Sequence, residues 1–352
     1  MQHILIIGAG VSATALALRL AATDVGEKTQ SELTITLVDK SRGVGGRMAT
    51  RRRDGFAFDH GAQFFTARSA EFRALIEAEM ARGTVAEWRP RLTTLEKQRP
   101  AYKREWFEPH YVAAPSMTAL CKSALGQLSE RGAAELRLGA QVTSLERSDG
   151  AAGARWRAMC GDEPLGSYDF VVSAAPCRQT ELLFAGTGFA GTEAMARASH
   201  LPCFSLMVGL ERMPELNFDL AVVKQSPIAL IVANDSKPGR IGRGSLLVHS
   251  DNEWARDHLE DDLASVQAHL LGELSALVPI EAEALSHVDL HRWRFAKTEL
   301  AADDDFLLDA PNALAACGDW CLGGRVEDAF LSGYRLGDAL RQHLAAGRGI
   351  IG

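Results

Sequence analysis

The chain has 352 residues, of which 47% are hydrophobic and 24% charged, and its formal net charge is −7. The length favours two domains, and the acidic balance argues against a general nucleic-acid binder. No stretch approaches the roughly 20 uninterrupted apolar residues of a membrane span, so no membrane association is expected. The six cysteines show no disulfide framework, and we expect reduced thiols in a cytoplasmic protein.

The chain begins MQHILIIGAGVSATALALRL, an apolar run that enters a glycine pair. A secretory signal would carry basic residues before the run and would not contain Gly8 and Gly10 in its middle. A nucleotide-binding strand, turn and helix fits better, because Gly8 allows a tight turn and Gly10 lets the backbone approach a pyrophosphate. Val11 and Ser12 then open a helix whose first amides face the phosphates, and Ala13 keeps that helix close to the sheet. A glycine-rich turn without a ligand is the alternative for this motif taken alone.

A second strand, residues 33–40, ends in Asp39. An acidic residue at this place can hold both hydroxyls of an adenosine ribose, and a solvated strand end is the alternative. The preceding polar run DVGEKTQSE lengthens the usual spacing and is interpreted as a surface loop. The run SRGVGGRM follows, and it favours a resident FAD over a passing NAD: its glycines let the chain pass tightly under the cofactor, while Arg47 neutralises the pyrophosphate.

Two further motifs support a flavin. Gly61 and Ala62 permit close backbone approach to a flat ring, and Gln63 offers both a donor and an acceptor. Near the C-terminus, Gly318 permits close approach and Asp319 can bind a ribityl hydroxyl or a phosphate oxygen. The final helix, which opens after residue 323, can direct its positive N-terminal end at the charge that develops on a reduced flavin.

The runs DKSRGVGGRM, DHGAQFFTAR and CGDWCLGGRVEDAFLSG together closely resemble the bacterial renalase group of the FAD-dependent amine-oxidase-like superfamily. The resemblance implies an α/β, GR2-type flavoprotein: a Rossmann-like FAD-binding domain with an inserted α+β substrate domain built on an antiparallel sheet. It also implies non-covalent FAD. The expected cofactor contacts are Gly8, Gly10, Val11, Ser12, Asp39, Lys40, Arg42, Gly46, Arg47, Gly61, Ala62, Gln63, Phe64, Val142, Gly318, Asp319, Arg325 and Val326.

The middle of the chain predicts the domain plan. We expect a helix over about 69–91, a surface loop over 97–106, a helix from 115 to about 128, a strand over 136–145 and a buried parallel strand over 170–176. Longer strands between 202 and 294, interrupted by one helix over about 257–277, predict an antiparallel sheet. The predicted FAD-binding domain is 1–70, 112–180 and 305–352, and the predicted substrate domain is 71–111 and 181–304.

The resemblance implies oxidation of the 2-dihydro and 6-dihydro isomers of NAD(P)H to NAD(P)+, with O2 reoxidising the flavin to give H2O2. Substrate contacts are expected from Gln63, Phe64, Phe65, Arg68, His249 and Trp293, although a lone His or Trp is as often a packing residue. No metal site is expected. The alternatives are an FAD-dependent amine or other small-molecule oxidase and a non-catalytic flavin-binding redox module; the sequence leaves the oligomeric state open.

Overall fold

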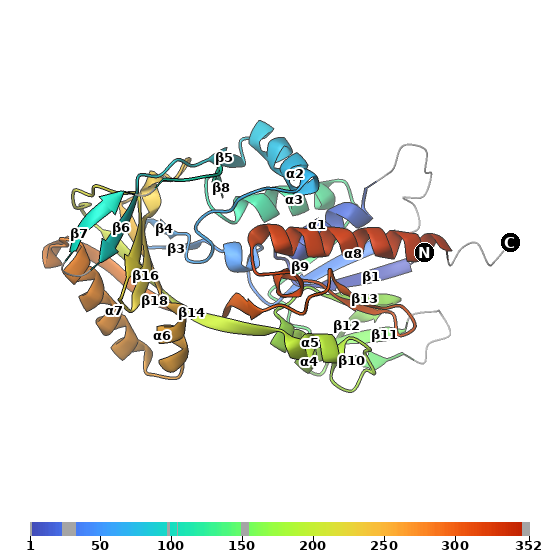
Figure 1. The fold of residues 1–352 in the computed structure, drawn as a ribbon. Coiled ribbons are helices and arrows are strands. Elements are labelled where there is room, and N and C mark those ends of the chain that lie inside the picture. The colour runs from blue at the N-terminus through green and yellow to red at the C-terminus, as the bar shows by residue number, and fades with distance from the viewer. Residues whose placement is uncertain (1, 23–32, 97–98, 104, 149–154, 347–352) are drawn as a thin grey trace. The chain divides into compact units, whose positions relative to one another are not determined.

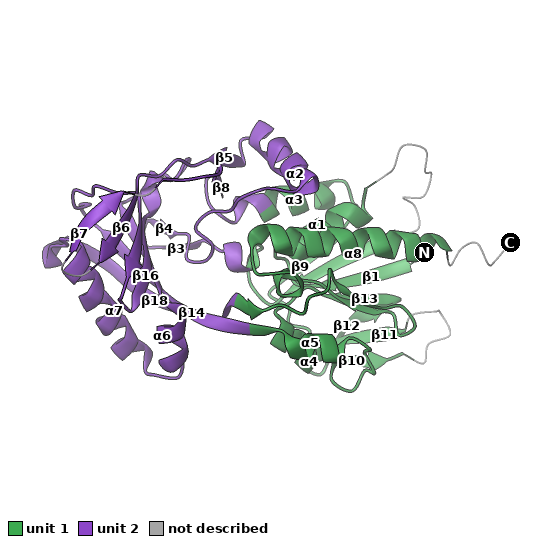
Figure 2. Cartoon of the chain, viewed as in Figure 1, with its two compact units in different colours: residues 1–46, 121–199, 298–352 green, residues 47–120, 200–297 purple. Residues whose placement is uncertain are grey.

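The computed structural model describes residues 2–22, 33–96, 99–103, 105–148 and 155–346 (Figure 1). They form two compact units: unit 1 is residues 1–46, 121–199 and 298–352, and unit 2 is residues 47–120 and 200–297 (Figure 2). These units differ from the predicted domain boundaries by placing residues 47–70 and 112–120 in unit 2 and residues 181–199 and 298–304 in unit 1. Backbone pairing explains part of the difference, because Phe65 exchanges two hydrogen bonds with Tyr111 and so ties the segment after residue 47 to unit 2.

Unit 1 is built on a six-stranded sheet whose order is typical of a Rossmann-like fold, which confirms the predicted fold class. The order is β19 (Leu307–Asp309), β20 (Leu314–Ala316), β13 (Phe170–Ser173), β1 (Gln2–Ile7), β2 (Leu33–Asp39) and β9 (Glu135–Leu138). All neighbours pair in parallel except β19 with β20. The central strand β1 is buried on both faces, which explains its continuous apolar run.

Two long helices of unit 1 lie side by side, α1 (Val11–Leu20) and α8 (Val326–Ala346) (Figure 1). Gly333 on α8 faces α1 so closely that a Cβ there would overlap the carbonyl oxygen of Ser12. The remaining elements of unit 1 include α3 (Ala119–Glu130), α4 (Cys177–Phe184), α5 (Thr192–Arg197), the short η5 (Asp319–Cys321) and an antiparallel sheet of β10 (Ser144–Arg147), β11 (Trp156–Cys160) and β12 (Glu163–Tyr168).

Unit 2 contains a seven-stranded sheet, largely antiparallel as expected. Its order is β18 (Leu285–Leu300), β14 (Ser199–Leu210), β17 (Ser245–Ser250), β16 (Ile228–Ala233), β15 (Leu220–Lys224), β6 (Leu92–Glu96) and β7 (Arg99–Lys103). The pair β15 and β6 is parallel. Apolar side chains of α7 (Leu263–Leu277), such as Leu270, are buried in one cluster with sheet residues such as Phe204 and Leu246.

Unit 2 also contains shorter elements. They are η2 (Gly46–Met48), which begins at the last residue of unit 1, β3 (Arg51–Arg53), β4 (Phe56–Phe58), α2 (Ala70–Ala81), β5 (Val85–Glu87), β8 (Tyr111–Ala113), η3 (Asn234–Ser236), α6 (Asn252–Asp257) and η4 (Ala282–Ala284).

Four predicted elements are corrected, each for a local reason. The helix expected over 69–91 ends at Ala81, because Gly83 adopts a left-handed φ of 75°. The strand expected over 136–145 is divided into β9 and β10 at Gly139, where φ is 71°. The helix expected over about 257–277 is α7, which begins later, at Leu263, because Asp262 caps it. The expected loop over 97–106 contains the strand β7, which pairs with β6. The run DVGEKTQSE lies outside the described residues.

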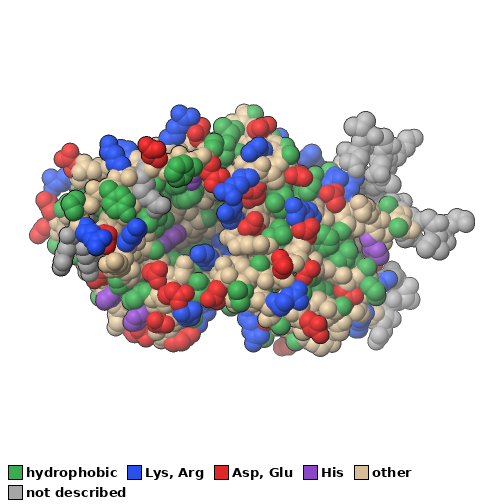
Figure 3. Space-filling view, viewed as in Figure 1, with side chains coloured by type: hydrophobic (Ala, Val, Ile, Leu, Met, Phe, Trp, Pro, Cys, Tyr) green, Lys and Arg blue, Asp and Glu red, His purple; other side chains and the backbone are tan. Residues whose placement is uncertain are grey.

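Charged side chains of both signs are interspersed over the face seen in Figure 3, in keeping with the modest net charge. Within the described residues, no helix has both the length and the apolar character that crossing a membrane requires.

We expect Gly333→Ala to lower the free energy of unfolding by about 1–3 kcal/mol, because the added methyl group must push α8 away from α1. Urea denaturation followed by circular dichroism measures this difference. Gly272→Ala on α7 is the matched control: a Cβ there meets nothing within 4 Å, and the change should stabilise by about 0.5–1 kcal/mol. Equal effects of the two substitutions would contradict the close contact of α1 and α8.

Candidate functional site

In unit 1, the predicted cofactor residues gather where parallel strands end. Gly8 follows β1 with a φ of 113°, and its amide donates to the Val38 carbonyl at 2.8 Å. A Cβ at Gly8 would lie 3.2 Å from the Ala174 carbonyl oxygen of the chain beyond β13. Because β1 lies between β2 and β13, this turn sits at the switch point of the sheet, where open α/β folds bind ligands.

Asp39 organises the turn through backbone amides. One carboxylate oxygen accepts from the Ala9 amide at 2.8 Å and the other from the Ser41 amide at 2.7 Å. The side chain is only partly buried, so its remaining acceptor positions are available to a ribose. Asp39 therefore shapes the glycine-rich turn and also offers the acceptors expected of it.

The second glycine motif packs directly on the first. The Gly45 amide donates to the Ala9 carbonyl at 2.8 Å, and a Cβ at Gly46 would lie 3.4 Å from the Gly10 Cα. Gly46 has a φ of 54°, a conformation in which glycine is favoured. The two backbone segments therefore lie in direct contact, as expected for a chain that passes close under a dinucleotide.

A third segment joins this edge. The amides of Gly139 and Ala140 donate to the carbonyls of Ser41 and Asp39 at 2.9 and 3.1 Å. Val142 follows this segment and is buried between β9 and β10. Its expected contact with the cofactor remains a prediction.

The closing motif is held by hydrogen bonds of its own. A Cβ at Gly318 would overlap the Trp320 indole nitrogen, and the Gly318 amide donates to the Ser332 hydroxyl at 3.0 Å. Asp319 is buried and accepts from the Thr298 hydroxyl at 3.2 Å. Arg325 is exposed at the start of α8, where its amide donates to the Asp328 carboxylate at 2.8 Å, and Val326 is half-buried beside it.

Some predicted cofactor residues face elsewhere in this structure. The Ser12 hydroxyl is buried and donates to the Cys317 thiol at 3.0 Å, so only its backbone is available to a phosphate. Lys40 and Arg42 are exposed, and the Lys40 ammonium lies 3.3 Å from the Gln179 side-chain oxygen. The backbone contacts at Gly8, Gly10 and Gly46, which we call the backbone cradle, are thus in place, whereas the side chains of Ser12 and Lys40 are engaged with other residues.

In unit 2, Arg47 and Gly61 form a close backbone crossing. The Ala62 amide donates to the Arg47 carbonyl at 2.8 Å, and a Cβ at Gly61 would overlap that carbonyl oxygen. Glycine is therefore required at residue 61. The Arg47 guanidinium lies 3.4 Å from the Ala296 carbonyl.

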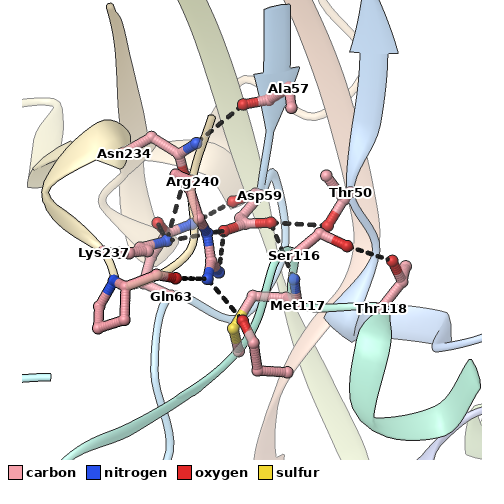
Figure 4. A network of polar contacts seen from close by, with 12 residues as sticks. Thr50, Ala57, Asp59, Gln63, Ser116, Met117, Thr118, Asn234, Lys237 and Arg240 are labelled. Atoms are coloured by element: carbon pink, nitrogen blue, oxygen red, sulfur yellow. Dashed lines mark hydrogen bonds and ion pairs between the residues drawn. The ribbon is translucent and has the colours of Figure 1, made fainter. Parts of the chain in front are cut away.

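A buried polar network surrounds Gln63, also in unit 2 (Figure 4). The Lys237 ammonium donates to the Gln63 side-chain oxygen at 2.8 Å and to the Asp59 carboxylate at 3.3 Å. Arg240 contacts the same Asp59 oxygen through two nitrogens, at 3.0 and 2.6 Å. Burial acts to raise the pKa of Asp59, but the two cations and hydrogen bonds from Thr50 and Met117 hold it at about 2.

His249 and Trp293 meet at one backbone carbonyl. The Trp293 indole donates to the His60 carbonyl at 2.9 Å, and its ring stacks on the His60 ring with centroids 5.2 Å apart. His249 also forms a hydrogen bond to the His60 backbone, and its Nε2 lies 3.2 Å from the Gln63 amide nitrogen. Burial lowers the pKa of His249 to about 4 and that of His60 to about 3, so both rings are neutral near pH 7.

The other three predicted substrate residues, Phe64, Phe65 and Arg68, have surroundings that differ from one another. The Phe64 ring contacts Trp106 and His110, with ring centroids at 5.4 and 4.7 Å, so the segment before β8 brings aromatic rings to it. Phe65 is buried against Phe72, a core position that gives it a packing role. The Arg68 guanidinium is paired with both Glu108 oxygens, at 2.8 and 2.6 Å, so a substrate anion would have to displace that carboxylate. The structure thus brings Gln63, His249 and Trp293 together, while the roles of the other three remain predictions.

Sequence reasoning missed the residues that hold Gln63. Lys237 and Arg240 lie in the run NDSKPGR after an apolar strand, and such polar, Pro- and Gly-containing runs usually indicate an exposed turn. Asp59 lies inside the quoted motif DHGAQFF, and its preceding apolar strand was the available signal for burial. No group of His, Cys, Asp or Glu in the described part of the chain is arranged to bind a metal ion.

Residues 6–78 match the family model described as an NAD(P)-binding Rossmann-like domain. Across nearly the whole chain, the fold is similar to three solved structures of low sequence identity. A proposed protoporphyrinogen oxidase from Exiguobacterium sp. 255-15 aligns with a TM-score of 0.74 at 13% identity, covering 97% of this chain and 99% of that one. Cyclohexylamine oxidase from Brevibacterium oxydans IH-35A aligns with a TM-score of 0.72 at 11% identity, covering 98% and 99%.

The third structure is a reduced UDP-galactopyranose mutase, which aligns with a TM-score of 0.72 at 12% identity, covering 97% of this chain and 96% of that one. At these identities the likeness establishes the fold, and the fold is consistent with the FAD expected from the sequence motifs. The occurrence of oxidases and a mutase on one fold means that the reaction must be argued from the site.

We expect Asp59→Asn to lower the free energy of unfolding at pH 7 by about 3–5 kcal/mol, because two buried cations lose their carboxylate. The pKa of Asp59 is lower in the folded protein than in the unfolded chain. The carboxylate therefore stabilises the fold fully at pH values above its unfolded-state pKa, and this stabilisation is lost as the pH falls towards about 2. The difference in the free energy of unfolding between the wild type and Asp59→Asn should therefore become smaller between pH 4 and pH 2. Chemical denaturation across this range measures it, with the exposed Asp162→Asn as control; a constant difference would contradict the ion pairing.

Proposed function

We propose that the chain is an FAD-dependent oxidase that converts 2-dihydro or 6-dihydro isomers of NAD(P)H to NAD(P)+. The observation that carries the cofactor part is the backbone cradle of unit 1. Gly8, Gly10 and Gly46 bring the backbone together beside the Asp39 carboxylate with no side chain at the points of contact, an arrangement that suits the close approach of a pyrophosphate. When bound, FAD supplies the hydride acceptor and passes the electrons to O2, which yields H2O2.

The substrate part is supported by the neutral character of three predicted substrate residues that lie together in unit 2, Gln63, His249 and Trp293. A dihydropyridine ring loses hydride without a base, because the product is an aromatic cation. His249 is neutral, Gln63 is an amide and Trp293 is held by the His60 carbonyl, so these groups can bind and orient a ring but do not form a nucleophile and base pair. Catalysis by positioning is the chemistry that such groups support.

An amine oxidase is the second candidate, and the likeness to cyclohexylamine oxidase favours it. The tyrosines argue the other way. Tyr334 stacks on Phe330, Tyr111 stacks on Phe65, and Tyr168 is buried beside His3, so each of these three rings packs against another ring of its own unit. Tyr102 lies on the exposed strand β7. A non-catalytic flavin-binding module is the third reading, in which FAD would stay oxidised with every donor.

The first experiment is anaerobic mixing of the purified holoenzyme with 2-dihydro, 6-dihydro and ordinary 4-dihydro NAD(P)H and with a panel of amines. We expect rapid loss of oxidised-flavin absorbance with the 2-dihydro or 6-dihydro isomer alone, because only these correspond to the proposed substrate. Bleaching by an amine alone would transfer the protein to the second candidate. A flavin that no donor reduces would contradict both oxidase assignments.

We expect Asp39→Ala to weaken FAD binding by roughly tenfold or more, because a charge-assisted hydrogen bond to the ribose is lost. The flavin content after gel filtration and the dissociation constant from fluorescence titration measure the effect. Asp162→Ala, in the exposed turn between β11 and β12, is the control. Undiminished affinity in a folded Asp39→Ala protein would exclude Asp39 as a ribose ligand.

A further inference from the structure

Lys237 is a completely buried ammonium group with three oxygen acceptors. Its side chain is 0% exposed, and its nitrogen lies 2.8 Å from the Gln63 side-chain oxygen and 3.3 Å from both the Asp59 and Asn234 side-chain oxygens. Figure 4 shows Lys237 and Arg240 approaching Asp59 together. A lysine is almost never fully buried unless it is paired, so this placement calls for a role.

The ammonium decides which way the Gln63 amide faces. An ammonium can only donate, so the Gln63 atom beside Lys237 must be the amide oxygen. The amide nitrogen is then directed at the carbonyls of Asp59 and Gly61, at 2.5 and 2.9 Å, and at His249 Nε2, at 3.2 Å. A donor at this distance requires Nε2 to be an acceptor, which leaves the ring proton of neutral His249 on Nδ1.

We propose that Lys237 is a positioning residue that orients the Gln63 amide and, through it, holds His249 as the neutral ring protonated on Nδ1. The chain Lys237, Gln63, His249 continues to the His60 carbonyl, which also receives the Trp293 indole. One buried cation therefore acts on the hydrogen-bonding pattern of two predicted substrate residues, Gln63 and His249, while Trp293 shares the His60 carbonyl with His249. Its effect on the reaction rests on the proposed function; its effect on the His249 tautomer does not.

The surroundings of Lys237 define its pH dependence. Asp59 stabilises the ammonium, whereas Arg240 opposes it, and the Trp88 ring lies 5.8 Å from the nitrogen. Burial is the largest effect, and it lowers the pKa of Lys237 to about 8. Because the ammonium is the donor-only form, the orientation of Gln63 is enforced below this pH and relaxes as the pH rises through it.

The direct test is the tautomer of His249, read from ¹⁵N NMR of the histidine-labelled protein and assigned with His249→Gln. We expect the Nδ1-protonated ring in the wild type and a mixture of tautomers in Lys237→Met, where the amide can turn its oxygen towards His249. Lys122→Met, on the exposed face of α3, is the matched control. An unchanged tautomer in Lys237→Met would mean that the Asp59 and Gly61 carbonyls alone hold the amide, and it would overturn the proposal.

A second variant keeps the test decisive if Lys237→Met does not fold. Gln63→Glu retains an acceptor for Lys237 but removes the amide hydrogens that face His249. We expect the His249 proton to move to Nε2, where it can donate to the new carboxylate. A ring that stays protonated on Nδ1 in this folded variant would overturn the orientation by Gln63.

The kinetic test uses the rate constant of anaerobic flavin reduction by the dihydronicotinamide that proves active. We expect Lys237→Met to lower this rate constant about tenfold with little change in the substrate dissociation constant, since orientation is lost. The rate constant of the wild type should fall as the pH rises above about 8, and this decrease should be absent in Lys237→Met. The same decrease in the variant would overturn the kinetic role of Lys237. If no dihydronicotinamide reduces the wild type, the proposed function fails and the NMR result alone decides the role of Lys237.

Discussion

The polar interior of unit 2 depends on one buried carboxylate. Asp59 is the anionic partner of both Lys237 and Arg240, and without it two cations would lie in an apolar interior. The arrangement leaves one net positive charge, which helps to keep His249 neutral because a second cation nearby would be repelled. Neutral hydrogen-bonding groups and a fixed amide orientation thus follow from the same charge balance.

The candidate cofactor site of unit 1 is built from backbone rather than from a network of side chains. Its cradle is made of backbone, brought together by residues that lack a side chain at the points of contact, Gly8, Gly10 and Gly46. The Asp39 side chain supports that cradle, because its two oxygens anchor amides on both sides of the turn. A phosphate can be bound by any closely placed hydrogen-bond donors, such as backbone amides. A reacting ring needs contacting side chains whose orientation is itself fixed by further residues behind them.

This difference explains how much the sequence could predict. Glycine spacing after a buried strand has few structural explanations, so the Rossmann-like sheet, Gly8, Gly10 and the end of β2 were foreseen. Lys237 could not be, because a polar run after a strand is read as solvent-exposed and its burial depends on Asp59, far away in the chain. The corrected elements have the same origin: Gly83 and Gly139 break patterns whose apolar periodicity continues past them.

The site argues for hydride transfer more strongly than for acid–base chemistry. A general base near pH 7 needs a pKa close to that pH, whereas burial places His249 at about 4 and His60 at about 3. The buried group whose pKa lies nearer to neutrality, Lys237, is committed to Gln63 and Asp59. Hydride transfer from a neutral dihydropyridine needs no base, so the neutral side chains of Gln63 and His249 support the proposed substrate class. The arrangement of these donors and acceptors, rather than the net charge of the network, carries that proposal.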